Sequence, residues 1–129
     1  MRKFAYIPSI LIAGAIVFLS SMPKPPVSLD LFIFQDKLAH LVAYFTLSFS
    51  VIFGIYYNSK KIPYKKILVI TFIIVALFGA SDEYHQSYVP GRDASFWDWA
   101  FDVIGAVLAA VLYKRINQKI VNLYKRIRN

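Results

Sequence analysis

The residues that could do chemistry in this chain are concentrated between Ser81 and Asp102, in the stretch SDEYHQSYVPGRDASFWDWAFD. This stretch holds five of the seven acidic residues, one of the two histidines and one arginine, and apolar runs flank it on both sides. Ionisable groups in or beside membrane-like segments are costly, and they occur mainly at functional sites or in paired networks. The stretch is therefore the first candidate for a functional site.

A second polar group begins an apolar run earlier in the chain, in the sequence DKLAHLVAYF. Asp36, His40 and Tyr44 recur every four residues, so a helix would place them on one face. Lys37 is adjacent to the first of them. A helix bundle could bring this group and the first one together around one pocket.

The two histidines and their acidic neighbours could hold a metal or transfer protons. Histidine nitrogen and carboxylate oxygen suit zinc, manganese or iron, and a divalent metal could use Asp36, His40, Asp82 and His85. A histidine beside a carboxylate can also act as a general acid–base or a nucleophile. The catalytic candidates are His40, His85, Asp82 and Glu83. No HExxH motif is present, and no cofactor other than such a metal is predicted.

Two cations could serve a different purpose, the binding of an anionic headgroup. Arg92 follows a Pro-Gly turn, and together with Lys37 it could hold a phosphate through charge-assisted hydrogen bonds. The alternative is a buried network without catalytic purpose, in which Arg92 pairs with Asp98 or Asp82 and both histidines are structural. The residues alone leave these interpretations open.

The composition favours a membrane protein. Hydrophobic residues make up 58% of the 129, whereas soluble domains have about 45–50%, and the mean hydropathy is +0.53. There is no cysteine, which excludes disulfide and thiolate chemistry. A helix that spans a bilayer needs about 17–25 mostly apolar residues, and the sequence offers such runs at residues 5–22, 38–57, 66–83 and 96–113.

We therefore predict an all-α integral membrane protein, with four transmembrane helices in a small bundle and a single domain over residues 1–129. Residues 114–129 carry isoleucine and leucine on one face with lysine and arginine between them. This pattern predicts a C-terminal basic amphipathic helix on a membrane surface. The aromatic segment SLDLFIF, which follows the first span, is too short to cross and is expected at the membrane interface.

Small residues mark one face of the fourth predicted span. Asp98, Asp102, Gly105 and Ala109 follow one another at intervals of four, three and four residues, which is one side of a helix. Small residues let transmembrane helices approach closely. This face is therefore expected to pack on a neighbouring helix and to bring two carboxylates to the contact.

The charges divide between the two ends of the predicted bundle. With four spans, one end holds 12 of the 15 basic residues and no acid, and the other holds three basic and all seven acidic residues. Basic residues of short loops stay in the cytoplasm, so both termini are expected there and the carboxylates at or toward the outer face. The basic end is expected to contact anionic lipid. No nucleic-acid partner is predicted, because no binding motif for one is present.

Both polar groups resemble the signatures of the VanZ-like family, small bacterial membrane proteins named after one linked to resistance to the glycopeptide teicoplanin. The family pattern is roughly D-K-x-x-H-x-x-x-Y, followed by D-E-x-H-Q-x-x-x-P-G-R and then D-x-x-x-N-x-x-G. The first signature matches at Asp36, Lys37, His40 and Tyr44. The second matches at Asp82, Glu83, His85, Gln86, Pro90, Gly91, Arg92, Asp98 and Gly105. Asp102 stands where the family usually has asparagine, so an acid replaces a neutral amide.

The resemblance covers about residues 1–113 and implies a four-helix protein of the cell envelope, in the bacterial cytoplasmic membrane. It does not supply a reaction. We expect a protein that binds a lipid-linked or glycopeptide-type ligand at its extracytoplasmic face, with a contribution to teicoplanin resistance. The alternative is a membrane enzyme that acts on a phosphorylated envelope lipid or cell-wall precursor. The residues expected to bind the ligand are Asp36, Lys37, His40, Tyr44, Asp82, Glu83, His85, Gln86, Arg92, Asp98 and Asp102.

Overall fold

The computed structural model describes residues 2–23, 34–59 and 61–128, and within these ranges it describes the side chains of residues 4 to 119. Every regular element in the described ranges is a helix. The elements, in chain order, are the 3-10 helix η1 (Arg2–Tyr6) and the α-helices α1 (Ile7–Ser20), α2 (Gln35–Asn58), α3 (Tyr64–Gln86) and α4 (Phe96–Arg128). Two prolines help to set where helices begin. Pro8 lies in the first turn of α1 and Pro63 directly precedes α3. At these positions a backbone amide has no hydrogen-bond acceptor within the helix, so proline costs nothing there.

Three of the helices are long and apolar enough to cross a membrane, namely α2, α3 and the part of α4 up to Lys119. α1 is shorter, at 14 residues. Together with η1 it extends about 30 Å at the usual rises of the two helix types, close to the thickness of a bilayer's hydrocarbon core. The prediction of four spans is therefore met in part, by three long apolar helices and a shorter one at the N-terminus.

The helix ends differ from the predicted ones in ways that matter for the site. α3 continues to Gln86, so the helix runs through the DEYHQ segment, three residues beyond the predicted span of 66–83. Residues 114–128, predicted as a separate basic helix, continue α4 without a break, and their placement on a membrane surface stays a prediction. The SLDLFIF segment lies almost wholly within residues 24–33, outside the described part of the chain.

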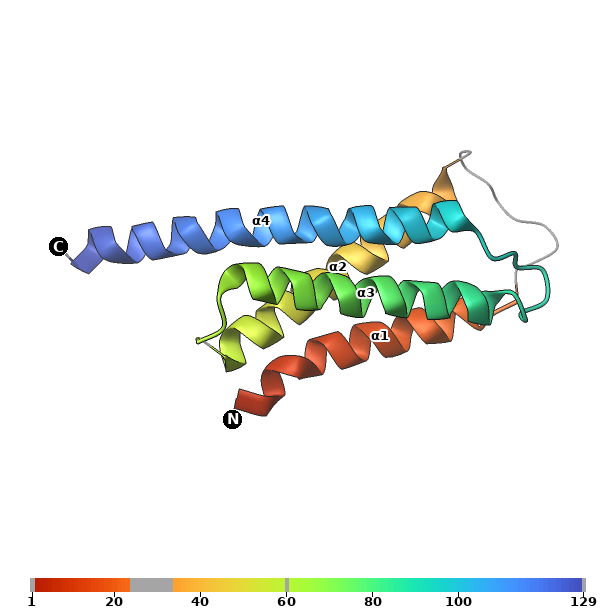
Figure 1. Ribbon diagram of the computed structural model, residues 1–129, viewed down its shortest axis with the longest axis horizontal. Coiled ribbons are helices and arrows are strands. Elements are labelled where there is room, and N and C mark those ends of the chain that lie inside the picture. The colour runs from red at the N-terminus through yellow and green to blue at the C-terminus, as the bar shows by residue number, and fades with distance from the viewer. Residues whose placement is uncertain (1, 24–33, 60, 129) are drawn as a thin grey trace.

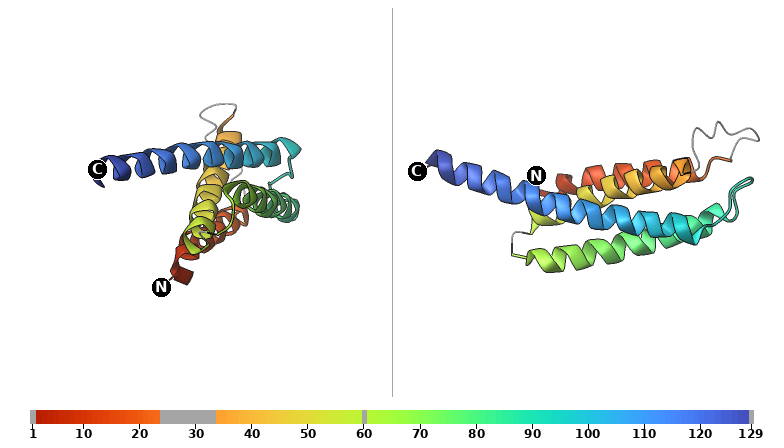
Figure 2. Two further views of the ribbon diagram at one scale, coloured as in Figure 1. Left: turned by 60° about the vertical axis from the view of Figure 1, so that its left-hand side comes forward. Right: turned by 90° about the horizontal axis from the view of Figure 1, so that it is seen from above.

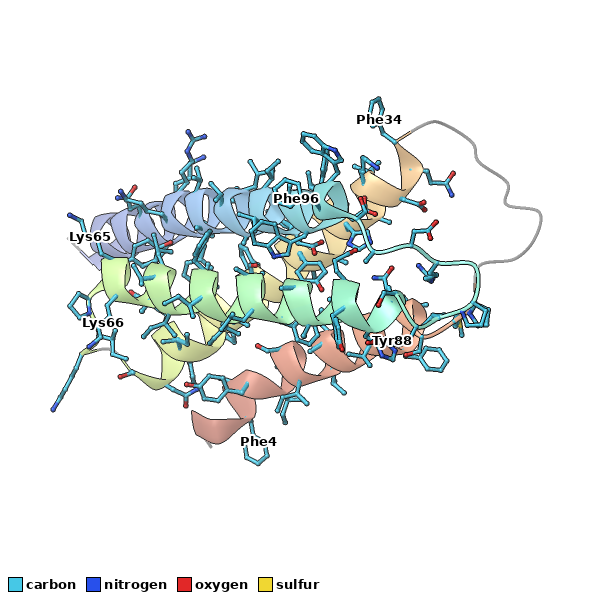
Figure 3. The ribbon with its side chains drawn as sticks, turned by 45° about the vertical axis from the view of Figure 1, so that its right-hand side comes forward. Phe4, Phe34, Lys65, Lys66, Tyr88 and Phe96 are labelled. Atoms are coloured by element: carbon cyan, nitrogen blue, oxygen red, sulfur yellow. The ribbon has the colours of Figure 1, made fainter. Side chains whose placement is uncertain are left out.

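The four α-helices run lengthwise through the molecule, with α2 crossing obliquely behind α3 and α4 (Figures 1 and 2). The end of α1, the start of α2, the end of α3 and the start of α4 lie at one end of the bundle (Figure 1). Figure 3 shows Phe34 and Tyr88 toward this end and Lys65 and Lys66 at the opposite one. The predicted polar segments are therefore at one end, and we call it the polar end.

The closest packing in the bundle is between α2 and α4, which share the most extensive helix contact. A Cβ atom at Gly105 of α4 would lie 2.5 Å from the carbonyl oxygen of Leu41 and 2.9 Å from the amide nitrogen of Phe45, both in α2. Asp102 and Ala109, on the same face of α4, are fully buried. The prediction that this face of small residues packs on a neighbouring helix is confirmed.

We predict that Gly105→Ala lowers the free energy of unfolding by about 1–3 kcal/mol, because the added methyl group forces two backbones apart. The measurement is the unfolding midpoint of the purified protein in detergent micelles. Gly14→Ala is the matched control, since no atom lies within 4 Å of a Cβ there and alanine favours a helix by about 1 kcal/mol. Equal effects of the two substitutions would contradict the close contact.

Candidate functional site

The centre of the polar end is a contact between His40 of α2 and Asp102 of α4. Nδ1 of His40 lies 2.9 Å from Oδ1 of Asp102, whose side chain is completely buried. The other oxygen, Oδ2, lies against α3, where a Cβ at Gly79 would be only 2.9 Å away. The ring of Tyr44, one turn along α2, stacks against His40 at a centroid distance of 6.2 Å. Three helices thus hold the imidazole and the carboxylate in place.

Glu83 brings the end of α3 into the same contact. Its Oε1 lies 3.8 Å from Nδ1 of His40, and its Oε2 accepts a 2.7 Å hydrogen bond from the amide of Ser95, just before α4. Only 7% of Glu83 is exposed. The backbone of the 87–95 loop therefore fixes the orientation of a buried carboxylate beside the histidine.

Lys37 and Asp98 form the outer part of this cluster. Nζ of Lys37 lies 3.4 Å from Oδ1 of Asp98, and both side chains are partly exposed. A partly exposed pair of this kind contributes little to stability, about 0–1 kcal/mol. Its importance lies in placing one ammonium group at the edge of a group of carboxylates.

Asp82 and His85 lie on another side of α3 and contact the end of α1, and Gln86, which is next to them on the helix, binds Asp82. Asp82 accepts a 2.6 Å hydrogen bond from Ser20 and a 3.0 Å hydrogen bond from Gln86. Nε2 of His85 lies 2.9 Å from the hydroxyl of Ser21 in an exposed position. The two serines, at the end of α1, were not predicted to contribute, and nothing in their local sequence distinguishes them.

Arg92 stabilises the end of α1. Its Nε donates to the carbonyl of Met22 at 3.0 Å and its Nη2 to the carbonyl of Leu19 at 2.9 Å. The last carbonyls of a helix lack partners within it and favour a cation. Among the described residues, Arg92 forms no ion pair with Asp98 or Asp82, so the predicted pairing is wrong. The guanidinium binds backbone oxygens instead.

A polar cavity of about 310 Å³ opens at this end of the bundle. Its lining combines acidic, basic and amide side chains from the start of α2, the end of α3, the 87–95 loop and the start of α4. The lining residues are Asp36, Lys37, Ala39, His40, Gln86, Gly91, Arg92, Asp93, Ser95 and Asp98. A larger cavity of about 470 Å³ between α3 and α4 is lined almost entirely by apolar side chains, so the smaller, polar one is the candidate site.

The structure separates the residues proposed to hold a metal. His40 and Asp36 line the cavity, whereas His85 and Asp82 contact the end of α1. A different group is closer together: ligand atoms of His40, Glu83 and Asp98 all lie within 4.8 Å of one another. Among the described residues, these three form the group that could hold an ion.

Three or four apolar helices around a polar cavity at one end of the bundle fit a multi-pass membrane protein. The family model VanZ/LLP1 matches residues 4–118, most of the chain. The protein therefore belongs to the VanZ/LLP1 family. No curated protein and no solved structure matches this chain.

We predict that Asp102→Ala lowers the free energy of unfolding by about 1–3 kcal/mol, because it removes the partner of a largely buried imidazole. Asp102→Asn should cost less, since its side chain keeps an acceptor oxygen for His40. The comparison is His85→Ala, an exposed position where the change should stay within about 0.5 kcal/mol. Denaturant titration in micelles measures all three, and a larger loss for His85→Ala would contradict this assignment.

Proposed function

We propose that the protein binds the phosphorylated headgroup of a lipid-linked cell-envelope molecule in the polar cavity. The observation that carries the proposal is the lining of that cavity, where Lys37, His40 and Arg92 come together. Ammonium and guanidinium groups bind phosphate through charge-assisted hydrogen bonds. Arg92 is held by α1 through two of its nitrogens, so its charge is positioned before any ligand arrives.

The position of the cavity suits a lipid ligand. It lies at the end of helices that are apolar along their length, so a headgroup could enter it while the acyl chains stay in the bilayer. Large exposed aromatic side chains occur around the same end, at Phe34, Tyr88, Phe96 and Trp97. Aromatic rings favour the level of the lipid headgroups, which supports a site at the membrane surface.

The proposed orientation places the cavity on the extracytoplasmic side of a bacterial cytoplasmic membrane, with both termini in the cytoplasm. Its support is the separation of charge between the two ends. The lysines and arginines far from the cavity whose side chains the structure describes are Lys61, Lys65, Lys66, Lys114, Arg115 and Lys119. Such residues favour the cytoplasmic side, where they would contact anionic lipids. A contribution to teicoplanin resistance, through binding of a cell-wall lipid, is the cellular role that we propose.

A second candidate function is catalysis on the same headgroup, and the contact between His40 and Asp102 favours it. A carboxylate on Nδ1 fixes the ring and leaves Nε2 to exchange a proton with a bound substrate. Incubation with short-chain phosphatidic acid and assay of released phosphate tests for hydrolysis. Release that is lost in His40→Gln and retained in His85→Gln would favour an enzyme, and absence of release would favour binding alone.

We predict that Lys37→Gln weakens binding of short-chain phosphatidic acid by about tenfold or more, since a hydrogen bond to a charged group contributes about 1.5–3 kcal/mol. Binding is measured with the purified protein in micelles, with the corresponding diacylglycerol as the ligand without phosphate. Lys114→Gln, at the opposite end, is the matched control. Equal binding of the two lipids, or equal losses in the two variants, would reject the proposed function.

A further inference from the structure

We propose that His40, Glu83 and Asp98 bind a divalent transition-metal ion at the base of the polar cavity. The three side chains come from α2, α3 and α4, and one ligand atom from each lies within 4.8 Å of the other two. Ligands of one zinc ion, each about 2.0–2.2 Å from the metal, lie about 3–4 Å apart. Movements of about 1 Å by side chains would therefore close the site.

The ligand atoms select the kind of ion. One imidazole nitrogen with two carboxylate oxygens suits zinc or manganese, whereas magnesium and calcium prefer oxygen alone. Asp102 holds Nδ1 of the ring, which leaves Nε2 to bind an ion, and a carboxylate on the other ring nitrogen is the supporting contact that metal-binding histidines usually have. Since Asp102 is completely buried, the imidazole ring is held in one orientation before the ion binds.

Glu83 supplies an independent reason to expect an ion. Its Oε1 is buried and has no hydrogen-bond partner among the described residues, although it lies 3.8 Å from Nδ1 of His40. The amide of Ser95 holds the other oxygen, so the carboxylate cannot turn away without breaking that bond. A buried charged oxygen without a partner is costly, and a metal ion at this place would satisfy it.

The charges of the cavity also favour a bound cation. Its lining includes three aspartates, Asp36, Asp93 and Asp98, against the two permanent cations Lys37 and Arg92, and Glu83 and Asp102 lie directly behind them. Among the described lining residues the acidic groups outnumber the permanent cations by three to two, so a phosphate would meet carboxylates as well as cations there. An ion on His40, Glu83 and Asp98 would offset two of these negative charges and could bridge the protein to the phosphate. This bridging role rests on the proposed function, whereas binding of the ion to the three side chains does not.

The test begins with the metal alone. Full-length protein in micelles, stripped with a chelator, is titrated with Zn²⁺ and with Mn²⁺, and the bound ion is counted after gel filtration. We expect one ion per chain, and Glu83→Gln and Asp98→Asn should each weaken its binding about tenfold or more. Asp93→Asn is the matched control, because this aspartate lines the cavity outside the cluster of three, and it should weaken the binding far less than Asp98→Asn does.

A second measurement needs no variant and so does not depend on the folding of one. Diethyl pyrocarbonate modifies histidine, and mass spectrometry distinguishes the peptides that contain His40 and His85. Zn²⁺ should protect His40 from modification and leave the exposed His85 as reactive as before. No retained ion, equal protection of both histidines, or equal losses in Asp93→Asn and Asp98→Asn would overturn the proposal.

The two proposals can fail separately. If wild-type protein retains no Zn²⁺ or Mn²⁺ but binds phosphatidic acid through Lys37, the metal site is wrong and the proposed function stands. If the ion binds through Glu83 and Asp98 but phosphatidic acid and diacylglycerol bind equally, the metal site stands and the proposed function is wrong. Phosphatidic acid binding that weakens in chelator and recovers with Mn²⁺ would support the bridging role.

Discussion

The close approach of α2 and α4 is the constraint on which the site depends. Gly105 has no side chain, so α4 lies against the backbone of α2 at Leu41 and Phe45. One turn away, this distance brings Asp102 within 2.9 Å of His40. Larger residues along this face of α4 would separate the helices and leave a buried acid without its imidazole. The backbone contact at Gly105 and the contact between Asp102 and His40 therefore depend on the same close approach of α2 and α4.

Polar contacts also attach α1, the shortest α-helix, to the bundle. Ser20 binds the buried carboxylate of Asp82, and Arg92 binds the last carbonyls of α1. In a bilayer, apolar side chains gain little from leaving lipid for protein, so helices associate through packing and through hydrogen bonds between them. Breaking a buried hydrogen bond leaves an unpaired group at a cost. These contacts fix where α1 ends relative to the cavity.

One surface of α3 holds α1, and a different surface contributes to the candidate site. Glu83 follows Asp82 directly, and one residue turns a helix by about 100°, so the two carboxylates leave α3 in different directions. Asp82 meets α1, and Glu83 meets His40 and the loop before α4. A single acidic pair in the sequence therefore divides between a structural contact and the candidate site.

The sequence by itself determined the helical class, the apolar segments and the gathering of acids at one end, because these follow from hydropathy, helical periodicity and the alternation of helices through a bundle. It also determined the face of α4 that packs, since small residues and carboxylates share one side of that helix. Only the tertiary structure decided which neighbour each polar side chain meets. Periodicity relates residues within one helix but leaves the rotation of that helix against its neighbours open. This is why His85, predicted to join the cluster, instead contacts Ser21 at the end of α1. Arg92 lines the cavity and also binds the last carbonyls of α1, while Glu83 lies beside His40.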